Sequence, residues 1–322
     1  MINVFINYIA SYLPEKVVTN IELAESGVYT AEQIANKIGI SKRFVAGDNE
    51  FVSDLAIKVS TKLFRDYNVD KDSIDMIIFC TQSPDYLIPG PEYILHKELN
   101  LPSNCKVVGY NSGCSGYLYG LNLAFSYIYS CQANKILLIT SETYSKHISS
   151  NDIGNRSIFG DGATASIISN ENLGLSYKFN NFLFYSDGSG FDKIINRGSA
   201  LGSNSSFQKF EMIGSDVYLF ASTIVVDLIN EYFDKNRIEK DSIDLFVFHQ
   251  ASKLVLDSLQ KKLKIPDHKF LRDIENIGNT VSNTIPISLT NYFSTNTSSK
   301  PKRILICGFG VGLSIGITIL EN

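Results

Sequence analysis

The sequence predicts an α/β protein built from two similar halves. Short apolar runs rich in β-branched residues alternate with amphipathic helical patterns along the 322 residues, which is typical of buried sheets covered by helices. Residues 69–83 (VDKDSIDMIIFCTQS) and 238–252 (IEKDSIDLFVFHQAS) are two copies of one pattern, with an offset of 240 − 71 = 169. A solenoid repeat is far shorter, roughly 20–50 residues. We therefore expect two fused and diverged halves, 1–170 and 171–322, that share an interface.

The repeat continues on both sides of the shared segment. Residues 53–69 and 222–238 keep the offset of 169, and both have the apolar spacing of an amphipathic helix. Downstream, KILLIT (135–140) pairs with RILICG (303–308) at 303 − 135 = 168. After the shared strand the first copy continues as Cys-Thr-Gln and the second as His-Gln-Ala. We expect the chemistry where the copies differ, because α/β sheets bind ligands at the carboxyl ends of their strands.

Turn residues divide the chain into short elements. The N-terminal MINVFINYIASYLPE lacks the basic start of a signal peptide and is expected to be a strand. Further buried strands are predicted at 76–80, 105–110, 135–140, 164–169, 244–249 and 303–309. Helices are predicted at 53–67, 115–131, 215–235 and 252–264. The segment 171–213, rich in Gly, Ser and Asn, is expected to be a surface excursion between the halves, and the polar segment 291–302 a second loop.

Composition excludes several classes of protein. The net charge of −4 argues against a nucleic-acid binder, which needs a basic surface. No apolar run approaches the roughly 20 residues of a membrane-spanning helix. The five cysteines include no CxxC pair, so we expect a reducing compartment, a cytoplasmic location and no zinc or other metal site.

Cys114 is predicted to be a nucleophile. It follows an apolar strand and a glycine-rich turn, and it precedes a helix with apolar residues at helical spacing. The dipole and the free N–H groups of a helix N-terminus favour a thiolate. A buried core cysteine is the commoner case in general. The remaining cysteines fit that description because they lie in or beside apolar runs: Cys80, Cys105, Cys131 and Cys307.

A nucleophilic cysteine needs polar partners. His249 is the one histidine that follows an apolar strand; the others lie in charged or polar stretches, namely His96, His147 and His268. Asn279 lies in a glycine-containing turn that opens a helix, where a capping or turn role is by itself the commoner explanation. Asp161 in FGDGA is expected to be structural. The glycine cluster 308–316 lacks the residues of a phosphate loop and is expected to let a substrate approach the backbone.

Seven segments, in this order and spacing, resemble β-ketoacyl-acyl-carrier-protein synthase III of the thiolase superfamily. They are SYLPEKVVTN (11–20), GISKRFVA (39–46), the Cys114 turn, FGDGA (159–163), FHQAS (248–252), GNT (278–280) and GFGVGLS (308–314). The resemblance covers nearly the whole chain. It implies a thiolase-like duplicated five-layer α-β-α-β-α fold, which also accounts for the internal repeat.

The resemblance implies a decarboxylating condensing enzyme with Cys114, His249 and Asn279 as its catalytic residues. Cys114 would take an acyl group from a coenzyme A or acyl-carrier-protein thioester, and no cofactor is expected. The backbone N–H groups of Cys114 and Val311 would hold the oxyanion. A malonyl thioester, expected to be malonyl-acyl carrier protein, would then lose carbon dioxide. His249 and Asn279 would stabilise the resulting enolate, which attacks the acyl group.

Further roles follow from the resemblance. The substrate pocket would include Ser215, Gly310 and Ile88, the last contributed by the partner subunit of a homodimer. Lys261 and Lys262 match basic positions of the carrier-docking face, although an ordinary solvated helix face explains them equally well.

The chain departs from the family pattern at several positions. Ser252 and Leu254 stand where the family has asparagine and a docking arginine. Gln33 and Ile153 replace the tryptophan and arginine that clamp the adenine of coenzyme A, with Arg156 nearby in sequence. We therefore expect carrier-bound donors to be preferred.

Two other functions remain open from the sequence. One is a family member that transfers the acyl group from Cys114 to another nucleophile without decarboxylation; the intact histidine and asparagine favour condensation. The other is a non-catalytic partner subunit of a condensing complex, against which the intact cysteine turn argues. A hydroxymethylglutaryl-CoA synthase is excluded because no glutamate lies near 82–83. The acyl donor, its chain length and the pathway are not specified by the sequence.

Overall fold

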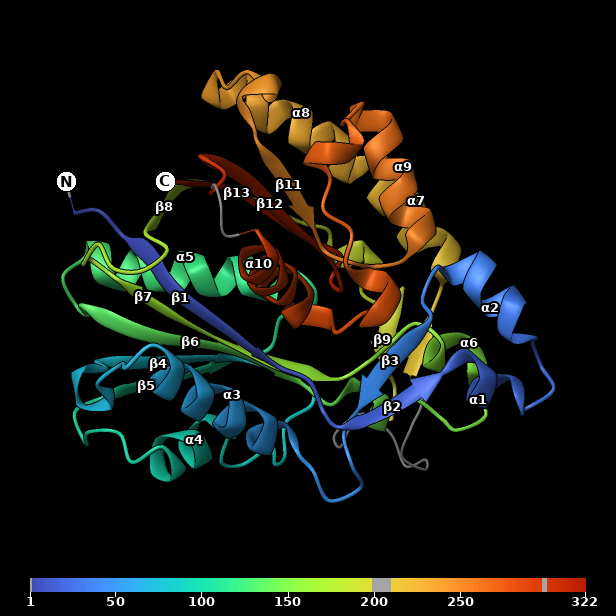
Figure 1. The fold of residues 1–322 in the computed structure, drawn as a ribbon, viewed down its shortest axis with the longest axis horizontal. Helices are drawn as coiled ribbons and strands as arrows, with labels where there is room; N and C mark the ends of the chain where they lie inside the picture. Colours follow the sequence, from blue (N-terminus) through green and yellow to red (C-terminus); the bar gives the residue numbers. More distant parts are fainter. Residues whose placement is uncertain (1, 199–209, 297–299) are drawn as a thin grey trace.

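Five layers stack in the order helices, sheet, helices, sheet, helices in the computed structural model (Figure 1). The structure describes residues 2–198, 210–296 and 300–322. The predicted duplicated fold is confirmed. The elements of the first two layers are α3 (Val52–Asp66), α4 (Glu92–Glu98), β5 (Lys106–Tyr110), β4 (Met76–Cys80), β6 (Lys135–Glu142), β7 (Gly162–Ser169) and β1 (Phe5–Tyr12).

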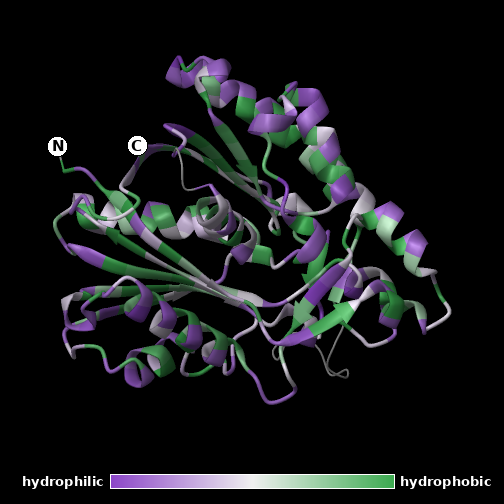
Figure 2. Ribbon diagram, viewed as in Figure 1, coloured by the Kyte–Doolittle hydropathy of each residue, from purple (hydrophilic) through white to green (hydrophobic). Residues whose placement is uncertain are grey.

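The middle layer consists of two helices, and the second sheet and outer helices follow it. The middle helices are α5 (Gly116–Tyr129) and α10 (Thr284–Thr295). The second sheet contains β8 (Tyr177–Ser186), β13 (Ser314–Glu321), β12 (Arg303–Gly310) and β11 (Leu245–Phe248). The outer helices are α7 (Gly214–Ser222), α8 (Ile224–Asn236) and α9 (Lys253–Leu263). Figure 2 shows apolar residues along the strands, whereas the outer helices carry hydrophobic and hydrophilic faces.

The two sheets join through a short contact. Strands β1 and β8 pair only at Phe5 with Lys178 and at Ile6 with Tyr177, which makes one nine-stranded order β11-β12-β13-β8-β1-β7-β6-β4-β5. Within each half the long pairings are internal, such as β6 with β7 and β12 with β13.

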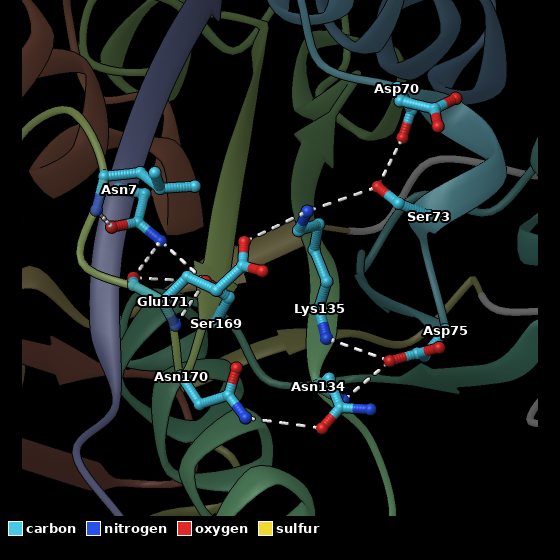
Figure 3. Close-up of polar contacts among 10 residues, drawn as sticks. Asn7, Asp70, Ser73, Asp75, Asn134, Lys135, Ser169, Asn170 and Glu171 are labelled. Carbon is cyan, nitrogen blue, oxygen red and sulfur yellow. Dashed lines mark hydrogen bonds and ion pairs between the residues drawn. The ribbon is translucent and has the colours of Figure 1, made fainter.

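The identical KDSID segments make the same contacts in both halves. The carboxylate of Asp75 accepts hydrogen bonds from the backbone N–H groups of residues 134 and 135, at 2.6 and 3.0 Å (Figure 3). The carboxylate of Asp244 accepts from those of residues 302 and 303, at 2.7 and 2.9 Å. Each aspartate therefore ties the start of its own strand to the parallel neighbour, which gives a physical reason for the repeat.

Small elements beside the two sheets frame the site. They are β2 (Lys16–Thr19), β3 (Lys42–Val45), α1 (Asn20–Ala24), α2 (Ala31–Ile38), α6 (Ile153–Arg156), β9 (Ile194–Asn196), β10 (Phe210–Met212) and short 3-10 turns, of which η2 (Tyr144–His147) borders the site. Strands β2 and β3, which are joined through α1 and α2, form a small antiparallel sheet near α6 (Figure 1).

Some sequence-based boundaries were wrong. The segment 171–213 contains β8, a central strand, whose asparagines at 180 and 181 lie at a register shift against β13 and obscure the apolar pattern. The helix predicted at 215–235 is two helices that meet at Thr223, because its hydroxyl bonds back to the carbonyl of Leu219 and competes with regular helix.

The loop predicted at 291–302 begins later than expected, because helix α10 continues to Thr295. The glycine cluster 308–316 contains the tight turn between β12 and β13, which pair up to Gly310 and Ser314. Other predicted strands and helices agree with the structure within a few residues.

Candidate active site

Residues from both halves line one enclosed pocket with a volume of about 140 Å³. Cys114 lies just before α5, Asn279 lies before α10, and His249 follows β11, so the structure brings the three predicted residues together. The pocket also reaches the β12–β13 turn at Gly310 and Val311. Among the described residues that line it, none is an aspartate, glutamate, lysine or arginine.

The thiol of Cys114 is buried and protonated in the resting protein. Burial and, secondly, the negative charge of Glu142 raise its pKa to about 12, whereas the backbone N–H groups of Val311 and Cys114 lower it. The position at a helix N-terminus was predicted correctly, but the expected thiolate is opposed by the loss of hydration that burial causes. The cysteine therefore needs a base when it attacks.

His249 can supply that base. Its side chain is 2% exposed, and burial lowers its pKa to about 3, so the imidazole is neutral at physiological pH. Nδ1 lies 2.7 Å from the hydroxyl of Thr284, which can donate in turn to the carbonyl of Val281 at 3.3 Å. In this arrangement Nδ1 carries the proton, and Nε2 is the acceptor nitrogen of the ring.

The amide of Asn279 has a defined orientation. Its Oδ1 accepts a hydrogen bond from the backbone N–H of Val281 at 2.9 Å, so the oxygen faces the main chain. Its Nδ2 lies 3.4 Å from Nε2 of His249 and 3.3 Å from the carbonyl of Ala251. The two side chains thus present neighbouring nitrogen atoms to the pocket.

Glycines allow the second half to approach Cys114 closely. A Cβ at Gly310 would lie 2.9 Å from both Cβ and Sγ of Cys114, and the φ of Gly310 is 157°. A Cβ at Gly308 would lie 2.9 Å from the carbonyl oxygen of Cys114. Only glycine fits at these points, and this brings the backbone of Val311 beside the sulfur.

The sequence did not single out Glu142, a fully buried carboxyl group behind the pocket. It accepts hydrogen bonds from the N–H of Gln82 and from the hydroxyls of Ser83 and Ser282, at 3.0 to 3.2 Å. Desolvation raises its pKa to about 8. The signal for this residue was present in the sequence, because an acidic residue lies two positions after the buried strand predicted at 135–140.

An aromatic cluster beside Cys114 was also missed. The rings of Tyr144, Phe159 and Phe210 pack edge-on or tilted, with centroids 5.1 to 5.4 Å apart, and Ile194 lies with them. Single apolar residues of this kind carry no distinctive sequence pattern, since it is the fold that brings them together. The cluster supplies an apolar wall suited to an acyl chain.

The predicted pocket residues have different positions. Gly310 lines the pocket, whereas Ser215 is exposed and its hydroxyl contacts Asp216; Val217 and Tyr218 of the same helix line the pocket instead. Ile88 is 91% exposed in the single chain and lies outside this pocket.

Both predicted docking lysines are exposed on α9, but one of them is already hydrogen-bonded within the chain. Lys262 donates to the carbonyl of Ser222 at 2.7 Å, which ties α9 to α7. Lys261 is exposed on α9. Leu254 is 56% exposed and also lines the pocket mouth, so the entrance is apolar where the family pattern has an arginine.

The positions of the adenine clamp hold no equivalent group. Gln33 and Thr30 form a capping box at the start of α2, in which each side chain accepts a hydrogen bond from the backbone N–H of the other residue. Ile153 is buried in a small apolar cluster. Arg156 donates to the carbonyl of Ser150 at 2.9 Å.

The described part of the chain contains no group of three or more His, Cys, Asp or Glu that could hold a metal ion. No described helix is long and apolar enough to cross a membrane.

This duplicated five-layer fold, with a buried cysteine and a histidine–asparagine pair at the junction of its halves, defines a thiolase-fold acyltransferase. Family models for 3-oxoacyl-[acyl-carrier-protein] synthase III and for its C-terminal part match residues 109–188 and 233–322. A β-ketoacyl-[acyl-carrier-protein] synthase III from Clostridium perfringens is 32% identical over 316 residues, 96% of each chain. The chain belongs to the 3-oxoacyl-[acyl-carrier-protein] synthase III family.

Solved structures agree with this assignment. The crystal structure of a 3-oxoacyl-(acyl-carrier-protein) synthase III matches with a TM-score of 0.92 and 35% identity, over 99% of this chain and 100% of that chain. A 3-oxoacyl-(acyl-carrier protein) synthase from Burkholderia xenovorans matches with a TM-score of 0.92 and 28% identity, over 99% of this chain and 94% of that chain.

Proposed function

We propose that this enzyme condenses an acyl thioester with malonyl-acyl carrier protein through an acyl-Cys114 intermediate, with loss of carbon dioxide. The observation that carries the proposal is the pair of neighbouring nitrogen atoms, Nε2 of His249 and Nδ2 of Asn279, in a carboxylate-free pocket with Cys114. Hydrogen-bond donors without a nearby negative charge stabilise an enolate, whereas a carboxylate would repel it.

The first step transfers the acyl group to sulfur. Nε2 of His249 accepts the thiol proton of Cys114 while the sulfur attacks the thioester carbonyl. The backbone N–H groups of Cys114 and Val311 hold the tetrahedral oxyanion. The carbon–sulfur bond to the carrier then breaks, and the imidazolium returns its proton to the leaving thiolate. The products are acyl-Cys114 and the free thiol of the donor.

The second step forms the carbon–carbon bond. The malonyl carboxylate leaves as carbon dioxide, and its bonding electrons move to the thioester carbonyl to give an enolate. Donors aimed at this oxygen can each be worth roughly 3–4 kcal/mol. The enolate carbon attacks acyl-Cys114, the oxyanion collapses, and the released thiolate of Cys114 takes up a proton. The product is a β-ketoacyl thioester.

His249 must accept a proton in the first step and donate a hydrogen bond in the second, and Thr284 explains how it can do both. The hydroxyl has one hydrogen and two acceptors in reach, the carbonyl of Val281 and Nδ1 of His249. When it donates to Val281, Nε2 is an acceptor. When the ring exchanges its Nδ1 proton for one on Nε2 through water, the hydroxyl rotates and donates to Nδ1, and Nε2 then donates to the enolate.

We further infer a homodimer, with the two halves 1–170 and 171–322 in each chain. Strand β5 is an edge strand of the sheet with partly exposed valines, and the apolar loop at Ile88, which precedes α4, is exposed. Pairing of two such edges would cover both features in an isologous interface, which is the common form of symmetric dimers. The partner's Ile88 would then face the acyl pocket.

The donor is expected to be carrier-bound rather than free coenzyme A. An aromatic stack and a cation–π contact are each worth roughly 0.5–1.5 kcal/mol, and neither forms at Gln33 and Ile153. Docking of an acidic carrier would rely on Lys261, with the apolar Leu254 at the mouth. We infer a cytoplasmic location from the five cysteines, which are all free.

The experiment separates the two steps. The protein is incubated with acyl thioesters on coenzyme A and on acyl carrier protein, and its intact mass is measured. One acyl group is expected on Cys114 and none on Cys114→Ala. Carbon dioxide release from a malonyl thioester is then compared among the wild type, His249→Ala and Asn279→Ala. Both variants are expected to acylate slowly and to lose decarboxylation. Wild-type decarboxylation in both variants would favour the non-decarboxylating acyltransferase instead.

A further inference from the structure

A second cavity of about 410 Å³ lies between the β2–β3 sheet, the segment 145–150 and α6. We call it the Arg43 cleft, after the buried arginine in its wall. Four cationic side chains line it, and one carboxylate, Asp48. The cationic residues are Lys16, Arg43, Lys146 and Arg156. Its volume falls within the roughly 300–1,000 Å³ that is typical of small-molecule sites.

Arg43 is fully buried without an anionic partner. Its two terminal nitrogens donate to three neutral acceptors, namely the carbonyl of Val18, Oδ1 of Asn20 and the carbonyl of Ser157, at 2.7 to 3.2 Å. Its Nε–H has no hydrogen-bond partner. A buried charge that is not neutralised costs free energy, so this guanidinium favours an anion nearby.

The charges around Arg43 add to this demand. The pKa of Arg43 is lowered to about 10, mainly by burial and secondly by the nearby positive charge of Arg156. The negative charge of Glu22 has a smaller effect in the opposite direction. No ion pair in the described part of the chain includes Lys16, Arg43 or Arg156.

The cleft adjoins the active site but is separate from it. Phe159 lines both cavities, so one side chain forms part of each wall. The carbonyl of Ser157 accepts a hydrogen bond from Arg43. The carbonyl of the next residue, Ile158, accepts one from the backbone N–H of Asn279 at 2.9 Å. Arg43 is therefore bonded to the same segment that holds a catalytic residue.

We propose that the Arg43 cleft binds a small ligand through its phosphate groups. The guanidinium of Arg156 can bind phosphate oxygens through charge-assisted hydrogen bonds, and the exposed Lys16 adds a second positive charge at the rim. Arg43, whose terminal nitrogens already donate to protein acceptors, contributes a buried positive charge. The cleft has four cationic side chains and one carboxylate, so the negative charges of two linked phosphate groups would balance its net positive charge. The phosphate can belong to coenzyme A or to a free phosphorylated compound, and the assay distinguishes these sources. The proposal does not depend on the proposed reaction.

The test is isothermal titration calorimetry with sodium pyrophosphate at constant ionic strength. The wild type is expected to bind one pyrophosphate per chain. Arg156→Gln and Lys16→Gln are each expected to raise the Kd about tenfold, the effect of one charge-assisted hydrogen bond or ion contact. Arg65→Gln, which changes an exposed arginine on α3, is the matched control and should leave the Kd unchanged. Arg43 is left intact because its replacement can unfold the β2–β3 sheet.

Three further titrations identify the source of the phosphate: coenzyme A, dephospho-coenzyme A and pantetheine. If coenzyme A loses affinity in Arg156→Gln while pantetheine does not, the ligand phosphates are those of coenzyme A. If only pyrophosphate is affected, the ligand is a free phosphorylated compound. The proposal is overturned if the wild type does not bind pyrophosphate, or if the two cleft variants and Arg65→Gln bind it with the same Kd.

Discussion

Replacing Glu142 with glutamine is expected to make the protein more stable at about pH 8 than the wild type. The carboxyl group is fully buried, and its pKa is raised from 4.5 to about 8 by desolvation. In the unfolded chain Glu142 ionises near the ordinary value, so folding binds a proton between these two pH values. Its contribution to stability is therefore present below about pH 4.5 and is lost as the pH rises through about 8.

The size of the effect follows from proton linkage. One pKa unit corresponds to about 1.4 kcal/mol, and integration between about pH 6 and pH 8 gives a loss of roughly 2 kcal/mol from Glu142 alone. In Glu142→Gln the amide oxygen can still accept from the N–H of Gln82, and the amide nitrogen can donate to the hydroxyls that surround it. The variant should keep its packing and lose this part of the pH dependence.

The assay is chemical or thermal unfolding of the wild type and Glu142→Gln across this pH range at one protein concentration. The difference in the free energy of unfolding should grow by roughly 2 kcal/mol from about pH 6 to pH 8, a shift of a few degrees in Tm. Glu98→Gln, at a partly exposed site on α4, should follow the wild type. Parallel profiles for the wild type and Glu142→Gln would refute the reasoning. The variant should also be alkylated faster at Cys114 above about pH 8, because one source of the raised pKa is gone.

Two further substitutions test the geometry of the site and of the proposed dimer. Gly310→Ala should fold but acylate Cys114 at least about tenfold more slowly, because the new Cβ would lie 2.9 Å from its sulfur; Gly188→Ala, with nothing within 4 Å, should keep the wild-type rate. Intact-mass time courses measure both, and equal rates would contradict the close approach. Ile88→Asp should produce monomers by light scattering, while Ile21→Asp, 74% exposed on α1, should not. Monomeric wild type with full activity would contradict the dimer.

The fold could be predicted because its apolar strands are short, continuous and repeated. The strands around the two KDSID segments were placed within a residue or two, since burial on both faces leaves a run of apolar residues. Strand β8 escaped prediction because its polar residues at 180 and 181 serve a register shift that only the paired strand explains.

The residues of the proposed catalytic site could be placed for a different reason. Cys114 and His249 each follow a predicted strand, so their position could be inferred from chain order. Thr284 could not, because its role depends on a 2.7 Å contact between two elements distant in sequence. The same holds for the orphan Nε–H of Arg43, which is visible only when all its neighbours are known.

The short junction between the two sheets bears on the order of folding. The two sheets pair with each other only at Phe5–Lys178 and Ile6–Tyr177. The long strand pairings, such as β6 with β7 and β12 with β13, lie within one half of the chain. Large chains fold through partly assembled intermediates. Cys114 comes from the first half, and His249 from the second. Secondary structure can therefore return on refolding before the two halves dock, and Cys114 should become open to acyl transfer only after docking.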